Sequence, residues 1–132
     1  MSFQVVIVTP EHQVLDETFE SVVLPAHDGQ IGLLTDRAPL LVKLGQGPLE
    51  LTARAGQPPR RFYVEGGIAQ MKDNRLTIVT NEAVPAATID AEAARAELAE
   101  ATAQRVVDDA SFEDRQRRMQ RARAMEAIAT QR

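Results

Sequence analysis

Two histidines and an aspartate are the only side chains of this chain whose types together suggest a catalytic group. They are His12, His27 and Asp28. Nucleophilic catalysis needs Ser, His and Asp in hydrogen-bonded series, and acid–base catalysis commonly uses paired carboxylates. Neither pattern surrounds these residues, and no glycine-rich phosphate loop is present. A histidine beside an aspartate in a turn is more typical of a solvated surface, so we predict that the chain is not an enzyme.

Composition also argues against metal and cofactor chemistry. The chain has no cysteine, which removes disulfides and thiol chemistry. Structural zinc sites normally use cysteine, and the chain has only two histidines. We therefore expect no metal site and no cofactor.

The most concentrated positive charge lies near the C-terminus. Residues 111–132 carry six basic and three acidic groups, whereas residues 88–110 carry two basic and six acidic groups. The basic side chains that could act together are Arg115, Arg117, Arg118, Arg121 and Arg123. As helices of a closed hairpin the two segments would attract each other, and opening would expose a cationic surface. That surface is either a solvated helix face or a docking site for an acidic protein. The net charge of −4 and the absence of aromatic residues among the arginines argue against nucleic acid.

A change of residue pattern near position 88 separates these arginines from the rest of the chain. Before it, β-branched segments alternate with Gly and Pro turns, and the last proline is Pro85. The pattern predicts about nine short strands. They cover residues 3–8, 13–15, 18–25, 31–34, 40–44, 49–53, 61–65, 67–71 and 76–80. Their spacing is typical of an antiparallel β-sandwich or flattened barrel, here residues 1–87. Gly66-Gly67 indicates either a bulge with close backbone approach or a simple flexible turn.

Residues 88–132 predict an antiparallel helical hairpin. We expect one helix from a cap at Asp90 to Val107, a connection at 108–110, and a second helix over 112–129. Ser111 and Asp114 resemble a capping box. The large apolar residues available to hold the hairpin together are few: Leu98, Val106, Val107, Phe112, Met119, Met125 and Ile128. Because most of the remaining contact surface is alanine, we predict a weakly docked and mobile hairpin.

The sequence predicts neither a signal peptide nor a membrane span. Residues 1–8 lack a charged leader, and no apolar run approaches about 20 residues. We expect a soluble chain that associates with a membrane only through a partner.

Three sequence blocks resemble those of a known family. The segment Gly29-Gln30-Ile31-Gly32-Leu33-Leu34, followed by Ala38-Pro39-Leu40-Leu41, is similar to the first block of the epsilon subunit of F-type ATP synthases. The second is Phe62-Tyr63-Val64-Glu65-Gly66-Gly67-Ile68, and the third is Leu76-Thr77-Ile78-Val79-Thr80 with Glu82-Ala83. The blocks occur in the family's order and the resemblance covers essentially the whole chain.

The resemblance implies a non-catalytic rotor subunit. Its sandwich would pack on the central-stalk gamma subunit and rest on the membrane c-ring, coupling the two during ATP synthesis. Its two C-terminal helices would fold against the sandwich or extend along gamma into the catalytic alpha/beta hexamer and inhibit ATP hydrolysis. The resemblance places the chain peripherally at the cytoplasmic face of the bacterial plasma membrane.

The family's c-ring loops correspond to Asp28, Gln30, Asp36 and Arg37. Many members have an acidic residue where this chain has Gln30 and a histidine where it has Arg37. Polar loops of this kind give an interface register and specificity. Ordinary turn chemistry is the other explanation of the two aspartates.

Some members bind ATP through an Ile/Leu-Asp-x-x-Arg-Ala motif on the hairpin. Here Ile89-Asp90 is followed by an arginine only at Arg95, five residues after the aspartate rather than three. With 3.6 residues per turn, Asp90 and Arg95 would not share a helix face. We therefore do not expect nucleotide binding. A small, non-enzymatic ATP sensor built on the hairpin remains the alternative function.

Overall fold

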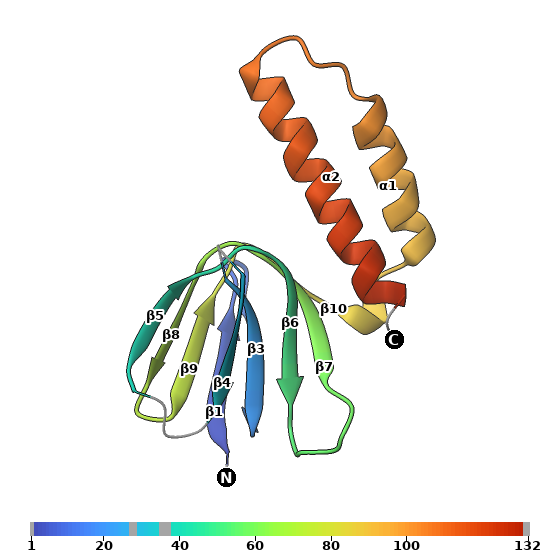
Figure 1. Cartoon of the computed structure of the whole chain (residues 1–132). Helices are drawn as coiled ribbons and strands as arrows, with labels where there is room; N and C mark the ends of the chain where they lie inside the picture. The colour runs from blue at the N-terminus through green and yellow to red at the C-terminus, as the bar shows by residue number, and fades with distance from the viewer. Residues whose placement is uncertain (1, 27–28, 35–37, 131–132) are drawn as a thin grey trace.

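Ten strands, one turn of 3-10 helix and two α-helices make up the described part of the chain, residues 2–26, 29–34 and 38–130 of the computed structural model (Figure 1). The strands are β1 (Phe3–Val8), β2 (Gln13–Phe19), β3 (Ser21–Ala26), β4 (Gly29–Leu34), β5 (Leu40–Lys43), β6 (Gln46–Thr52), β7 (Arg60–Glu65), β8 (Ile68–Lys72), β9 (Arg75–Val79) and β10 (Ala83–Pro85). The 3-10 turn covers Ala86–Thr88, and the helices are α1 (Ala91–Ala103) and α2 (Asp109–Thr130).

Alternating burial along the strands produces two sheets that face each other. In β8, for example, Ala69 and Met71 are buried while the residues between and beside them are exposed, as the two-residue period of a strand requires. One sheet has the order β2-β1-β9-β8-β5 and the other β10-β7-β6-β3-β4. Seventeen buried residues from both sheets form one apolar core. The predicted β-sandwich is confirmed.

One strand pair departs from the all-antiparallel prediction. β1 and β9 are parallel, with Val5 opposite Leu76 and Ile7 opposite Ile78. Hairpin turns force neighbouring strands to be antiparallel, but no turn links these two strands, which are far apart in the sequence. Their relative direction is therefore free to follow the register that turns both apolar rows inward.

Several predicted strand boundaries are wrong for identifiable reasons. β2 continues unbroken to Phe19, and β4 already begins at Gly29. β6 begins at Gln46, although Gly47 and Pro48 read as a break. Pro48 is tolerated because β3 pairs with β6 only at residues 50–52, so no partner strand on that side requires its missing N–H. The short β10, which pairs with β7, carries no strand signal of its own.

Gly66 and Gly67 form the close backbone approach that was one of the two interpretations of this pair. Both have positive φ angles, 70° and 101°. A Cβ added to Gly67 would lie 1.9 Å from the carbonyl oxygen of Val79. The Gly67 carbonyl in turn accepts a 2.9 Å hydrogen bond from the Leu44 N–H. The tight crossing therefore holds the ends of β5, β8 and β9 together.

The helix boundaries also differ from the prediction. α1 ends at Ala103, because Gln104 turns to an extended backbone conformation. α2 begins at Asp109, and its cap is formed by Asp108 and Ser111, not by the predicted pair Ser111 and Asp114. Asp108 Oδ1 accepts from the Ser111 N–H at 2.8 Å, and Ser111 Oγ accepts from the Asp108 N–H at 3.1 Å.

The apolar residues expected to hold the hairpin together are only partly used. Val106, Val107 and Phe112 are exposed, with 45%, 70% and 49% of their surface accessible. Met119 and Ile128 are buried as expected. The connection between the helices is therefore not part of the packed interface.

The hairpin stands on one end of the sandwich rather than along its face (Figure 1). α2 contacts β6, β7 and the 3-10 turn near its C-terminal end, and it packs against α1 along its length. The connection between the helices points away from the sheets.

Replacing the glycine at the crossing tests its structural role. We expect Gly67→Ala to lower the free energy of unfolding by more than about 2 kcal/mol, because the added Cβ collides with backbone atoms at a positive φ. Gly32→Ala is the matched control, since a Cβ there meets nothing within 4 Å. Urea unfolding measures both variants, and equal stability of the two would contradict this account.

Candidate functional site

The junction between α2 and the sandwich is the candidate functional site, because it determines where the hairpin lies. Its apolar part is small: Tyr63, Ala86, Ile89, Ile128 and Ala129 are buried together. Burying one isoleucine side chain stabilises by roughly 1.5–3 kcal/mol. The junction therefore has far less apolar burial than the sandwich core, which contains seventeen buried residues.

A polar network covers this apolar cluster. Arg121 of α2 forms an ion pair with Glu82 and lies 3.6 Å from a carboxylate oxygen of Glu65. The Tyr63 hydroxyl donates to Glu65 Oε1 at 3.1 Å, and the Gln46 amide donates to the same oxygen at 3.1 Å. The Arg121 guanidinium also lies over the Tyr63 ring, 5.8 Å from its centroid. One arginine thus joins α2 to β7 and to the segment before β10.

Burial and charge determine the ionisation of this network. Burial, and next the charge and hydrogen bond of Glu65, raise the pKa of the Tyr63 phenol far above its ordinary value. Burial alone would lower the pKa of Arg121, but its hydrogen bond to Glu82 and the charges of Glu82 and Glu65 raise it overall. Tyr63 is therefore neutral and Arg121 cationic throughout the physiological pH range.

Opposite charges also join the two helices, as the charge division of the sequence predicted. Arg118 lies 2.8 Å from Glu97 and 3.8 Å from Glu100. Arg95 lies 3.1 Å from Glu126. Such partly exposed pairs contribute little individually. Together they fix the register of α2 against α1.

The five predicted arginines separate into two groups. Arg115, Arg118 and Arg121 are engaged across an interface: Arg115 donates to the Thr102 carbonyl of α1, and the other two form the ion pairs above. Among the described residues, Arg117 forms an ion pair only within α2, with Asp114 at 2.6 Å. In the described part of the chain Arg123 makes no ion pair or side-chain hydrogen bond.

Asp90 and Arg95 have structural partners of their own. Asp90 caps α1 and accepts from the Glu92 N–H at 2.9 Å. Arg95 pairs with Glu92 and with Glu126 of α2. The two residues are not brought together.

Of the residues predicted for the c-ring loops, only Gln30 falls within the described residues. It is exposed near the start of β4 and lies opposite Pro25. Asp28, Asp36 and Arg37 lie outside the described residues, as does His27. His12 is exposed in the turn between β1 and β2.

Sequence reasoning missed the sandwich side of the junction: Gln46, Tyr63, Glu65 and Glu82. One signal for it was present. Phe62-Tyr63-Val64 is an uninterrupted apolar run, which indicates a strand covered on both faces, and all three residues are buried. No comparable signal marks Gln46 or Glu82, because their importance depends on the position of α2.

The described residues contain neither a metal-binding cluster nor a membrane-spanning helix. No group of three or more His, Cys, Asp or Glu side chains there could hold a metal ion. Neither helix, over those same residues, combines the length and the apolar character that a membrane crossing requires.

The chain is similar to known proteins over most of its length. The family model described as "ATP synthase, Delta/Epsilon chain, beta-sandwich domain" matches residues 2–86. The ATP synthase epsilon chain of Rhodopirellula baltica is 41% identical over 101 residues, which cover 76% of this chain and 77% of the relative. The ATP synthase epsilon chain of Synechococcus sp. (strain JA-2-3B'a(2-13)) is 37% identical over 131 residues, covering 95% and 91%.

A solved structure shares the fold of the whole described chain. It is a chain of the mitochondrial ATP synthase of Euglena gracilis, with a TM-score of 0.86 and 24% identity, covering 96% of this chain and 80% of that chain. A β-sandwich carrying a helical hairpin is thus an architecture found in ATP synthase. The sequence matches go further: this chain belongs to the ATP synthase delta/epsilon chain family, as the resemblance predicted.

The ionisation of Tyr63 tests the packing of the junction, because it is the only tyrosine of the chain. An exposed tyrosine has a pKa of about 10. The docked state raises this pKa. Above about pH 10 the native chain therefore keeps the Tyr63 proton, whereas the unfolded chain releases it. We therefore expect the free energy of unfolding to fall as pH rises above about 10, and little tyrosinate absorbance at about pH 10.5. A native-state titration with a midpoint near pH 10 would show that Tyr63 is not buried under α2.

Proposed function

We propose that this chain is the non-catalytic epsilon-type subunit in the central stalk of a rotary ATP synthase. In this proposal the sandwich connects the gamma subunit to the c-ring, and the hairpin restrains ATP hydrolysis by contacting the alpha/beta hexamer. The complex would place the chain peripherally at the cytoplasmic face of a bacterial membrane. Family membership supports the rotor assignment, and the small, charge-dependent junction under α2 is the observation that supports regulation.

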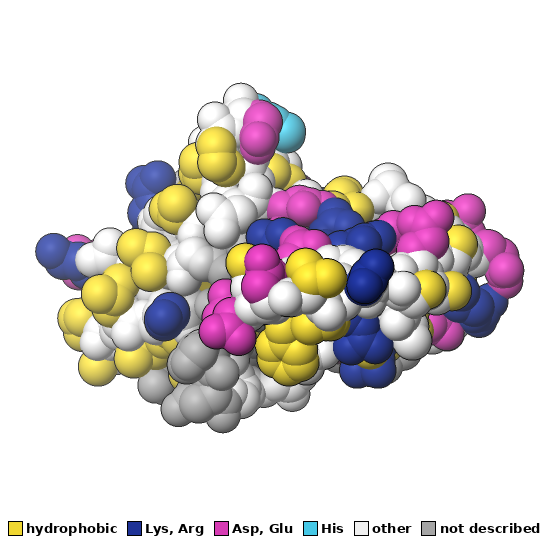
Figure 2. Space-filling model, turned by 90° about the horizontal axis from the view of Figure 1, so that it is seen from above, with side chains coloured by type: hydrophobic (Ala, Val, Ile, Leu, Met, Phe, Trp, Pro, Cys, Tyr) yellow, Lys and Arg dark blue, Asp and Glu magenta, His cyan; other side chains and the backbone are white. Residues whose placement is uncertain are grey.

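An exposed apolar patch supports gamma as the partner of the sandwich. Leu41, Ile68 and Val79 are 67%, 48% and 46% exposed. They lie on β5, β8 and β9, and strand register places all three on the outer face of one sheet. Hydrophobic side chains also gather on the side of the sandwich away from the helices in Figure 2. A contiguous apolar area on a small protein is typical of a protein interface, and the family supplies gamma as its occupant.

The proposed c-ring contacts are those that the resemblance implies: Asp28, Gln30, Asp36 and Arg37. The exposure of Gln30 near the start of β4 is compatible with this role.

The hairpin would work as a two-state element. In the docked state Arg118 and Arg121 are neutralised by Glu97 and Glu82. On the surface of the hairpin, acidic and basic side chains lie side by side (Figure 2). Released from these partners, the same arginines would be available to an acidic surface of the hexamer. A difference of a few kcal/mol between such states is enough for a partner to shift the population.

Neutralising one docking carboxylate tests the regulatory role. We expect Glu82→Gln to increase inhibition of ATP hydrolysis, because losing the pair with Arg121 raises the released fraction roughly two- to fivefold. Glu92→Gln is the matched control, since Glu92 pairs with Arg95 inside α1 and its side chain is 81% exposed. The measurement is ATP hydrolysis by the reconstituted complex, with hydrogen exchange of α2 as the readout of release. Increased exchange without a change in inhibition would contradict the regulatory role.

Arg123 tests the basic surface itself. Arg123→Gln removes a charge that is exposed in the docked state, so we expect unchanged docking and weaker inhibition in the same complex. If the double variant Arg117→Gln with Arg123→Gln inhibits as strongly as wild type, these arginines do not contact the hexamer.

We further propose that the hairpin does not bind ATP. The pocket beside Asp90 has a volume of about 410 Å³ and is lined by the carboxylates of Glu82, Asp90 and Glu97. Its one arginine, Arg121, is already paired with Glu82. Glu97 is likewise paired with Arg118, so the described lining residues supply no unpaired positive charge to attract a polyphosphate.

Calorimetry with magnesium and ATP tests whether the pocket beside Asp90 binds nucleotide. We expect no saturable heat that depends on the pocket beside Asp90, so the full-length wild type and Asp90→Ala should give the same heat at millimolar nucleotide. Saturable binding that is lost in Asp90→Ala would instead support the alternative function of an ATP sensor.

A further inference from the structure

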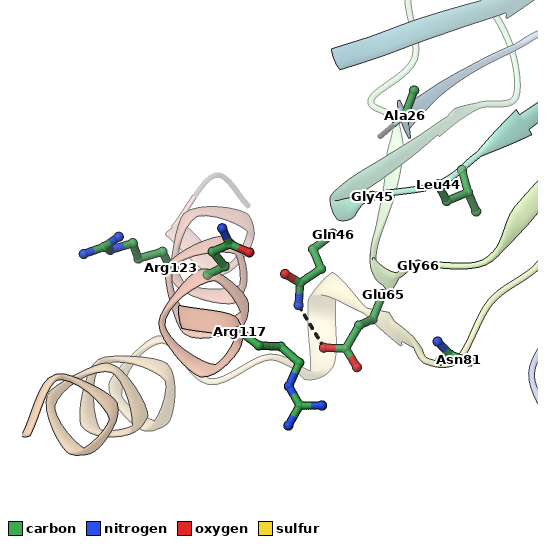
Figure 3. A pocket seen from close by; sticks show the side chains of 10 residues that line it. Ala26, Leu44, Gly45, Gln46, Glu65, Gly66, Asn81, Arg117 and Arg123 are labelled. Atoms are coloured by element: carbon green, nitrogen blue, oxygen red, sulfur yellow. Dashed lines mark hydrogen bonds between the residues drawn. The ribbon is translucent and has the colours of Figure 1, made fainter. Parts of the chain in front are cut away.

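A cleft of about 730 Å³ separates α2 from the nearby end of the sandwich. One wall is formed by Arg117, Gln120 and Arg123 of α2, and the other by strand ends and turns that include Gln46, Glu65 and Asn81 (Figure 3). The cleft shares no lining residue with the pocket beside Asp90. It lies on the other side of α2, and although Gln46 and Glu65 also belong to the docking network, no role described above assigns a ligand to the cleft.

The helix wall of the cleft is rich in donors. Arg117, Gln120 and Arg123 are spaced three residues apart, so they follow one another along one side of α2. Arg117 extends toward the Glu65 side of the cleft, whereas Arg123 extends away from it (Figure 3). Arginine's long stem lets the second guanidinium turn toward a ligand by changes of side-chain rotamer alone.

Among the described residues, the sandwich wall offers no uncompensated negative charge to match these donors. Within the part of the chain that the structure describes, Glu65 is the only carboxylate that lines the cleft. Its Oε1 already accepts from Gln46 and Tyr63 and faces Arg121 at 3.6 Å, so its charge is compensated. Within the described residues the side-chain amides of Asn81 and Gln120 have no protein partner. Arg117 is paired with Asp114 at 2.6 Å, whereas Arg123 has no ion pair among the described residues. The cleft therefore has unpaired amide donors and one uncompensated positive charge.

We propose that this cleft binds a small phosphate-bearing anion. The planar guanidinium fork matches the geometry of phosphate oxygens, and the amides of Asn81 and Gln120 can donate to the remaining ones. Gly45 and Gly66 line the cleft without side chains and leave room for the ligand. Because the walls belong to α2 and to the sandwich, the anion joins them and stabilises the docked hairpin by mass action.

Titration of the full chain with inorganic phosphate, and separately with pyrophosphate, tests the site at constant ionic strength. We expect saturable shifts of the backbone amide resonances of Gly66, Asn81 and Gln120, and slower hydrogen exchange of α2 at saturation. The double variant Arg117→Gln with Arg123→Gln should weaken binding at least about tenfold.

Arg105→Gln is the matched control, because it removes the same charge from an exposed position of the hairpin that does not line the cleft. Its affinity should stay within about twofold of wild type. Three outcomes would overturn the proposal: equal weakening by the control, the same shifts with chloride, or binding only to vesicles containing an anionic phospholipid. The isolated chain suffices for this test, so its result is independent of the rotor assignment.

Discussion

The ion pair between Arg121 and Glu82 is the interaction on which the arrangement of the two parts depends. Arg121 is about one-third exposed and sits over the Tyr63 ring, with Glu65 as its second carboxylate. In this partly desolvated position an unpaired charge is costly, so each member of the network requires the others. In the described residues no buried side-chain nitrogen or oxygen lacks a partner. The buried polar side-chain atoms of the docked junction are therefore all paired.

In this arrangement the sandwich and the hairpin differ in stability. The sandwich encloses its own apolar core between two sheets, and removing α2 would leave that core intact. The hairpin relies on the small cluster around Tyr63 and Ile128 and on partly exposed ion pairs. Elements with few buried apolar contacts open at a lower free energy than the core. The hairpin is thus the part of the fold suited to a change of position.

The sequence was informative where local pattern determines structure and uninformative where distant contacts do. Two-residue alternation identified most strands, and the division of charge near position 110 predicted that the helices attract. The partners of Arg118 and Arg121 could not be predicted, because they depend on the helix register and on where α2 meets β7. Val106 and Val107 were misplaced because apolar character alone does not distinguish a helix face from a connection. At Gly66-Gly67 the sequence left a close backbone approach and a flexible turn open, and only the position of Val79 decides between them.

The distribution of arginines along α2 makes docking and binding to another acidic surface mutually exclusive. Arg118 and Arg121 face Glu97 and Glu82 in the docked hairpin, so they cannot pair elsewhere at the same time. Arg117 and Arg123 face the cleft or solvent and stay available in the docked state. A partner can therefore make first contact through these exposed charges without breaking the junction. Only the later exchange of Glu82 for a carboxylate of the partner requires α2 to leave the sandwich. Exchange of Glu97, which lies on α1, requires the two helices to separate.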